Sequence, residues 1–319
     1  MNNLYFGGWK NINYKNEWRH LVTHQLSKKV MYDSLWKIVP PTKIPNTQFT
    51  LTGYSRAAKN TCFYIPEMKV MLDAGIEHDY IPDHVFITHC HSDHSKNIPQ
   101  CIIQICNFKS KNRKKVNVYV PIEMVNKVRN YIDSFYVMSK NNPNQKSALR
   151  YNLIGVQENT RINVVIRNID YVIEIIKCHH TVPCVGYGFI EIRKRLKLEY
   201  NALSKSELIT LKKSGVEISE TYEHPQFCYL GDTTEKVFED TPTLTQKYNF
   251  IMVECSFITK DQSDHALQKG HTVIDNLEPI IIQNSDKTFL LYHFSDRYER
   301  DEIVNFFEGK DYKNIIVWI

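Results

Sequence analysis

The sequence predicts an α/β fold in which two β-sheets pack face to face and helices cover their outer faces. Short apolar segments rich in β-branched and aromatic residues recur along the chain, separated by turns, as is typical of strands. Segments with helical spacing of apolar residues fall between some of these strands, and no internal repeat is present. A chain of 319 residues can bury the core that this layered arrangement requires.

The predicted elements follow from local apolar patterns taken in chain order. Short apolar runs predict strands at 63–65, 70–72, 85–88, 116–120, 162–166, 172–176, 188–192, 227–230, 250–253 and 289–292. Amphipathic spacing predicts helices at 95–107, 122–137, 204–214, 265–284 and 299–308. The first two strands are close enough in sequence to form a hairpin.

The composition is that of a globular protein, with 42% hydrophobic and 24% charged residues. No uncharged apolar run reaches the ~18 residues of a membrane span, and the N-terminus lacks the pattern of a signal peptide. Eight cysteines without a CxxC pair indicate reduced thiols. We therefore expect an intracellular, cytoplasmic protein that is neither secreted nor bound to a membrane. The basic run Lys111–Lys115 leaves nuclear import as an alternative.

The first 49 residues differ from the remainder in charge and aromatic content. Seven Lys/Arg and two acidic residues in this segment account for the whole net charge of +5. Trp9, Trp18 and Trp36, three of the four tryptophans, also lie here. Such a segment can bind nucleic acid by charge and stacking, or its tryptophans can anchor it to the body. We expect a basic, aromatic appendage at 1–49 and one main domain at 50–319.

The run His-Cys-His-Ser-Asp-His at 89–94 holds four metal-competent side chains within six residues: His89, His91, Asp93 and His94. It directly follows the apolar segment 85–88, so the side chains begin where a buried strand ends. Nitrogen and carboxylate ligands favour zinc, with manganese or iron as less suitable ions. The run therefore predicts a site for two metal ions side by side.

Other candidate ligands also follow apolar strands. Asp73, His180, Asp232 and His293 each lie at or just after the end of such a segment, as His89 does. Carboxylates and imidazoles gathered at one edge of a sheet would form a shared site on rigid supports.

Several further segments carry a family resemblance. They are Leu72-Asp73-Ala74-Gly75, the segment 180–187 (His-Thr-Val-Pro-Cys-Val-Gly-Tyr), Gly231-Asp232-Thr233-Thr234, Glu254-Cys255-Ser256-Phe257, Gly270-His271-Thr272 and the segment 293–298 (His-Phe-Ser-Asp-Arg-Tyr). With these motifs the chain resembles the metallo-β-lactamase fold superfamily and, within it, ribonuclease Z. The segments 196–200 (Leu-Lys-Leu-Glu-Tyr), 203–204 (Leu-Ser) and 211–218 (Leu-Lys-Lys-Ser-Gly-Val-Glu-Ile) resemble the short plant-type branch of that family. The resemblance covers roughly residues 50–310 and implies an αββα sandwich of two mixed sheets flanked by helices.

The resemblance also implies roles for single residues. One zinc ion would be held by His89, His91 and His180, the other by Asp93, His94 and His293, with Asp232 bridging both. His180 is chosen over His179 because the family's ligand lies six residues before the glycine of Gly-Tyr. Asp73 would brace the site, His271 would donate a proton and Glu254 would orient His271. The expected RNA contacts are Arg297, Lys194, Arg195 and Lys197, although basic runs are also common on solvated faces.

The activity implied by the resemblance is zinc-dependent removal of the 3′ trailer from precursor tRNA. Hydrolysis after the discriminator nucleotide would leave a 3′ hydroxyl and a 5′-phosphorylated trailer, with Asp93 accepting or steering the proton of the attacking water. Precursor tRNA and a second copy of the chain, in a homodimer, are the expected partners. A small-molecule hydrolase of the lactonase or thioesterase type is an alternative, and a non-catalytic RNA-binding scaffold is a third.

Three features depart from the family pattern. The basic, aromatic segment 1–49 has no counterpart in the short forms of the family, and it could contact RNA or mediate dimer contacts. Ser95-Lys96-Asn97 replaces small glycines after the metal run, so the approach of the substrate could differ. The inserted arm at about 190–228 is short and lacks a Gly-Pro-rich tip. A weaker grip on RNA would have to be supplemented by the basic clusters at 109–115 and 193–197 or by the appendage.

Overall fold

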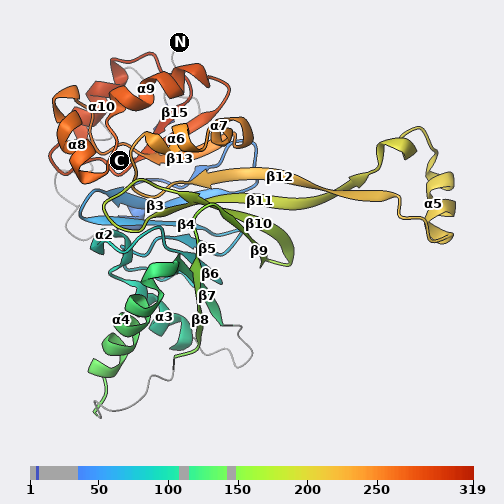
Figure 1. The fold of residues 1–319 in the computed structure, drawn as a ribbon, viewed down its shortest axis with the longest axis horizontal. Coiled ribbons are helices and arrows are strands. Elements are labelled where there is room, and N and C mark those ends of the chain that lie inside the picture. The colour runs from blue at the N-terminus through green and yellow to red at the C-terminus, as the bar shows by residue number, and fades with distance from the viewer. Residues whose placement is uncertain (1–4, 7–34, 108–114, 142–148) are drawn as a thin grey trace.

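Two mixed β-sheets packed against each other form the centre of the molecule (Figure 1). The computed structural model describes residues 5–6, 35–107, 115–141 and 149–319. In that part of the chain, the first sheet contains, in spatial order, β2 (Thr42–Lys43), β3 (Thr50–Arg56), β4 (Asn60–Ile65), β5 (Val70–Leu72), β6 (His84–Phe86), β7 (Val116–Pro121) and β8 (Tyr151–Val156). The second contains β1 (Tyr5–Phe6), β15 (Ile315–Val317), β14 (Thr288–Tyr292), β13 (Phe250–Glu254), β12 (Ser219–Tyr229), β11 (Val185–Leu196), β10 (Ile169–Lys177) and β9 (Thr160–Ile166).

Helices cover the outer face of each sheet (Figure 1). The first sheet carries α2 (Ser92–Ser95), α3 (Ile98–Asn107), η2 (Ile122–Met124) and α4 (Val125–Met138), and η1 (Leu35–Lys37) precedes β2. The second carries α6 (Lys236–Asp240), α7 (Thr243–Lys247), η4 (Lys260–Gln262), α8 (Ser263–Lys269), α9 (Ile274–Gln283) and α10 (Arg300–Glu308). This arrangement confirms the predicted αββα sandwich.

Aromatic side chains fill the space between the two sheets. The ring of Phe63 in β4 lies edge-on to Tyr229, Tyr292 and Trp318, at centroid distances of 5.8, 5.4 and 5.7 Å. All four side chains are fully buried. Burial of each large apolar side chain contributes about 1.5–3 kcal/mol, so this cluster fixes the sheets rigidly beneath the loops that follow their strands.

All ten predicted strands are present, but one predicted helix was wrong at its centre. The segment 265–284 is divided into α8 and α9 by Gly270, which ends α8 at φ +67°. A Cβ atom on Gly270 would lie 2.9 Å from the Cα of His180. The backbone at His180 therefore lies too close to position 270 for any residue with a side chain. The interruption leaves His271 in a loop rather than on a helix.

The arm and the N-terminal segment extend the sandwich differently. β11 and β12 project beyond the sheet as a two-stranded ribbon that ends in η3 (Leu198–Tyr200) and α5 (Lys205–Lys213), within the predicted arm (Figure 1). In contrast, residues 35–49 pack on the body, where Trp36 and Phe49 are buried. Most of the predicted appendage (residues 1–4 and 7–34, with Trp9 and Trp18) and residues 109–114 of the predicted basic cluster lie outside the described residues. No helix in the described ranges combines the length and apolarity needed to cross a membrane.

Candidate metal centre

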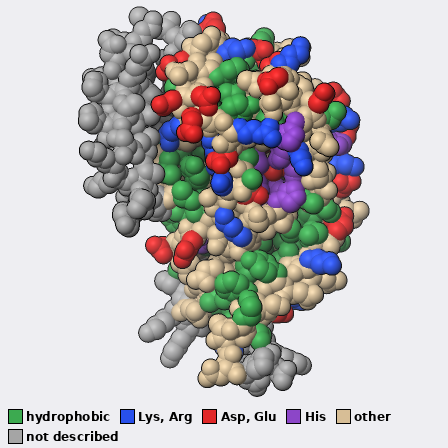
Figure 2. Space-filling model, turned by 90° about the vertical axis from the view of Figure 1, so that its left-hand side faces the viewer, with side chains coloured by type: hydrophobic (Ala, Val, Ile, Leu, Met, Phe, Trp, Pro, Cys, Tyr) green, Lys and Arg blue, Asp and Glu red, His purple; other side chains and the backbone are tan. Residues whose placement is uncertain are grey.

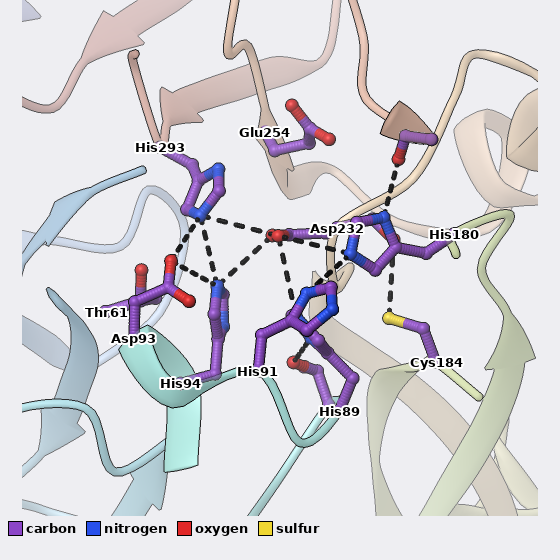
Figure 3. Close-up of polar contacts among 12 residues, drawn as sticks. Thr61, His89, His91, Asp93, His94, His180, Cys184, Asp232, Glu254 and His293 are labelled. Atoms are coloured by element: carbon purple, nitrogen blue, oxygen red, sulfur yellow. Dashed lines mark hydrogen bonds and ion pairs between the residues drawn. The ribbon is translucent and has the colours of Figure 1, made fainter. Parts of the chain in front are cut away.

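The seven predicted metal ligands converge at one edge of the sandwich, where strands end (Figure 3). The run 89–94 follows β6 and enters α2, His180 follows β10, Asp232 follows β12 and His293 follows β14. Of these seven residues, only His91 and His180 have intermediate exposure, and the His180 side chain itself is buried. Rigid strands therefore hold ligands that are up to about 200 residues apart in sequence.

Four of these side chains form a first group, consisting of His89, His91, His180 and Asp232. One potential ligand atom from each lies within 4.8 Å of the others. His180 Nε2 is 3.0 Å from His91 Nδ1. Asp232 Oδ2 lies 3.6 Å from His89 Nε2 and 3.8 Å from His180 Nε2. The spacing suits one cation surrounded by three imidazoles and a carboxylate.

The second group consists of Asp93, His94 and His293, again with ligand atoms within 4.8 Å of one another. His293 Nε2 lies 3.1 Å from His94 Nε2 and 3.2 Å from Asp93 Oδ2. Asp232 also faces this group, with Oδ1 3.3 Å from His94 Nε2 and Oδ2 3.4 Å from His293 Nε2. The Asp232 carboxylate therefore stands between the two groups.

The donor atoms fit a divalent cation. His94 Nδ1 and His180 Nδ1 donate to Asp73 and to the Gly270 carbonyl, which directs both Nε2 atoms into the site. Within the described part of the chain, His89 Nε2 and Asp232 Oδ1 are buried without a hydrogen bond. Lone pairs of nitrogen and oxygen atoms that face one another in a buried site are unfavourable. A proton can bridge only one pair of such atoms, whereas a divalent ion can bind three or four of them. Nitrogen and carboxylate oxygen are the donors that zinc, and also manganese and iron, accept.

The histidines keep the two site carboxylates ionised. Burial alone raises the pKa of Asp232, but His293, His94 and His89 outweigh it and hold that pKa well below its ordinary value. Burial likewise opposes ionisation of Asp93, but His293 and His94 lower its pKa to about 2. The backbone N–H of Ala58 also donates to Asp93 Oδ2 at 2.9 Å. Both carboxylates are thus negative at neutral pH and suited to a cation.

A histidine–carboxylate pair adjoins the two groups. His271 Nδ1 lies 2.7 Å from Oε1 of the buried Glu254, which ends β13. The N–H of Thr233 donates to the same oxygen at 3.1 Å. Burial lowers the pKa of His271, but Glu254 and Asp232 outweigh it and raise that pKa to about 9. His271 can therefore carry a proton beside the metal centre, although Asp232, His271 and His293 together also have metal-compatible spacing.

Asp73 lies behind the metal groups and belongs to neither. Its Oδ2 accepts from His94 Nδ1 at 2.7 Å and from the Tyr229 hydroxyl at 2.6 Å. Its Oδ1 accepts from the Thr88 N–H at 2.7 Å. The sequence interpretation missed Thr88, Tyr229 and Ser256 as partners of the site. Thr88 directly precedes the histidine run, and this position could have indicated that it lies beside the site. No local sequence pattern relates Tyr229 to Asp73.

The predicted RNA-contact residues lie in two separate places. Arg297 is exposed, with Nη2 3.1 Å from His265 Nε2 and its guanidinium 5.6 Å from the centre of the Phe257 ring. Phe257 in turn lies 6.4 Å from His271, between ring centres. Figure 2 shows a face on which histidine side chains gather with Lys and Arg side chains near them. In contrast, Lys194 and Arg195 lie in the last part of β11 and Lys197 directly precedes η3, so all three belong to the arm that projects from the sandwich (Figure 1).

Comparisons with known proteins identify relatives. No protein-family model matches the chain. The curated protein tRNase Z TRZ2, chloroplastic, from Arabidopsis thaliana is 29% identical over 267 residues, which cover 80% of this chain and 70% of that protein. The protein tRNase Z TRZ1 from the same plant is 29% identical over 259 residues, or 80% of this chain and 88% of that protein.

A solved structure supports the fold. The metallo-β-lactamase fold protein YhfI from Bacillus subtilis superposes with a TM-score of 0.53 and 15% identity, covering 84% of this chain and 94% of that one. At this identity the likeness concerns the fold alone. Taken together, the comparisons show that the chain is similar in sequence to proteins named tRNase Z and has the metallo-β-lactamase fold.

Proposed function

We propose that this protein is a zinc-dependent endoribonuclease that removes the 3′ trailer from precursor tRNA by cleaving after the discriminator nucleotide. The observation that carries the proposal is the His271–Glu254 pair, 2.7 Å between Nδ1 and Oε1, beside two groups of metal-compatible side chains. Phosphodiester hydrolysis needs both an activated water and a proton for the leaving oxygen. The similarity to proteins named tRNase Z supports precursor tRNA as the substrate.

In this proposal, two zinc ions occupy the two groups described above. His89, His91 and His180 would hold one ion and Asp93, His94 and His293 the other, with Asp232 placed to contribute to both. When bound, such ions lower the pKa of water and neutralise negative charge on a phosphate. The donor sets support zinc over manganese or iron because they combine several imidazoles with few carboxylates.

The side chains of this protein would then move the protons of the reaction. Asp93, ionised and held by the Ala58 N–H, accepts or steers the proton of the attacking water. As the bond between phosphorus and the 3′ oxygen breaks, His271 donates its proton to that oxygen. Glu254 orients His271 and favours its protonated form. The products are a 3′ hydroxyl on the tRNA and a 5′ phosphate on the trailer.

The RNA would be held outside the metal centre as well. Arg297, fixed by His265 and the Phe257 ring, is suited to a backbone phosphate near the cleavage position. Lys194, Arg195 and Lys197 on the projecting arm would contact a more distant part of the tRNA. We further propose an intracellular homodimer, in which the arm of one copy contributes to the grip on RNA bound by its partner.

Cleavage of an end-labelled precursor tRNA, mapped to the nucleotide, tests the proposal. The zinc-loaded protein should make one cut after the discriminator, and Asp93→Ala should abolish it. A wild-type protein that carries metal, leaves the RNA intact and hydrolyses lactones or thioesters would instead be a small-molecule hydrolase.

A further inference from the structure

The Thr88 hydroxyl lies between a buried carboxylate and a predicted ligand. Its oxygen is 2.9 Å from Asp73 Oδ2 and 3.1 Å from His89 Nδ1, and all three residues are fully buried. A hydroxyl has one hydrogen, and an ionised carboxylate can only accept. The Thr88 hydrogen therefore points to Asp73, and the hydrogen between Thr88 and His89 must come from the ring. Consequently Nδ1 of His89 carries the hydrogen and Nε2 carries the lone pair.

Ser256 has the same arrangement on the other side of the site. Its hydroxyl oxygen is 2.8 Å from Glu254 Oε2 and 3.1 Å from His293 Nδ1. Two further atoms lie near this oxygen. The backbone carbonyl oxygen of His293, 3.1 Å away, also only accepts, and Nδ1 of His271, 3.4 Å away, carries the hydrogen that it donates to Glu254 Oε1. Whichever oxygen receives the Ser256 hydrogen, the ring of His293 must donate through Nδ1. Its Nε2 is left facing Asp93 and Asp232.

We propose that Thr88 and Ser256 are positioning residues that fix the tautomers of His89 and His293, one histidine in each metal group. The inference rests on the proposed metal-dependent function. A neutral imidazole can carry its hydrogen on either nitrogen, and a hydrogen on Nε2 would block a metal there. By accepting from Nδ1, each hydroxyl leaves Nε2 free to bind.

The two hydroxyls also connect histidines with different tasks. Asp73 accepts directly from His94 at 2.7 Å and reaches His89 only through Thr88. It therefore supports both metal groups at once. Glu254 in the same way accepts directly from His271, and it reaches His293 only through Ser256. Loss of the Thr88 hydroxyl should therefore affect the group that contains His89 and leave His94 bonded to Asp73. Loss of the Ser256 hydroxyl should affect the group that contains His293 and leave His271 bonded to Glu254.

Thr88→Val is the most direct test, because valine has nearly the same shape as threonine but no hydroxyl, and Thr88→Ser is its matched control. In the metal-free full-length chain with ¹⁵N-labelled histidine, NMR distinguishes the protonated from the unprotonated ring nitrogen. The wild type and Thr88→Ser should show His89 protonated at Nδ1. Thr88→Val should show a population protonated at Nε2. An unchanged His89 tautomer in Thr88→Val would overturn the inference.

Zinc affinity, measured by competition with a chelator, gives a second readout. Loss of a hydrogen-bond partner behind a ligand costs roughly 10–100-fold in metal affinity. Thr88→Val should weaken one of two zinc sites by that factor, and Ser256→Ala should weaken the other. Equal loss at both sites in both variants would indicate a general structural effect and contradict the inference.

The two proposals fail in different ways. A wild type that binds no zinc would refute the proposed function, while the tautomers of the metal-free chain would still decide the inference. If Thr88→Val does not fold, as judged by its thermal transition, Ser256→Ala provides the same NMR test at His293.

Discussion

Replacement of His271 by alanine separates proton donation from metal binding. His271 is held by Glu254 at 2.7 Å, and its pKa of about 9 keeps it protonated at neutral pH. Loss of a positioned general acid lowers the rate about 10²–10⁴-fold, which corresponds to a barrier increase of about 3–5 kcal/mol. We therefore expect His271→Ala to reduce kcat by that factor.

Metal content should stay unchanged in this variant. Both metal groups assigned in the proposed function are complete without His271, whose Nδ1 is bonded to Glu254 and lies 3.9 Å from Asp232 Oδ2. The assay combines single-turnover cleavage of precursor tRNA with metal analysis of the same samples. His179→Ala is a suitable control because His179 adjoins His180 but pairs with Asp240 at 2.8 Å.

The outcome that would refute this reasoning is a joint loss of metal and activity in His271→Ala. His271 would then be a ligand, as its metal-compatible spacing to Asp232 and His293 allows. A loss of metal in His179→Ala would contradict the choice of His180 as the ligand.

Three further predictions concern the same site. Burial lowers the pKa of His271 and Glu254 raises it, so Glu254→Gln should lower this pKa. His271 then loses its proton at a lower pH, and the decrease of kcat with rising pH should begin at a lower pH than in the wild type. A pH–rate profile with the same alkaline limb as the wild type would contradict this prediction. Gly270→Ala places a Cβ atom 2.9 Å from the Cα of His180, at a position whose φ of +67° also disfavours alanine. The zinc affinity should fall about 10–100-fold, as measured by competition with a chelator, because His180 would be displaced. An affinity equal to that of the wild type would contradict a role for this close approach. Zinc at 100 times its Kd should stabilise the fold by about 2.7 kcal/mol relative to the chelator-treated protein, as measured by urea unfolding, and equal stability would exclude tight binding.

The arrangement of layers could be predicted from the sequence because buried strands leave a local record. The segment Phe250–Val253, for example, is a continuous apolar run, and the structure buries every residue of the strand β13 that contains it. The strand β3 (Thr50–Arg56) was missed because its sequence, TLTGYSR, has no such run. Pairing with β2 and β4 places β3 in the sheet, and strand pairing is not recorded in local composition.

For the candidate site, the sequence by itself determined which kinds of side chain are available and that they follow strand ends. The spacing of 89–94 is local, and His180, Asp232 and His293 each follow an apolar segment. Only the tertiary structure decided which nitrogen of each ring faces the site. It also decided that Tyr229 of one sheet donates to Asp73 of the other, 156 residues away in sequence. Hydrogen-bond directions in a buried site depend on side chains from both sheets, and the packing that brings them together is set by the whole fold rather than by any one segment.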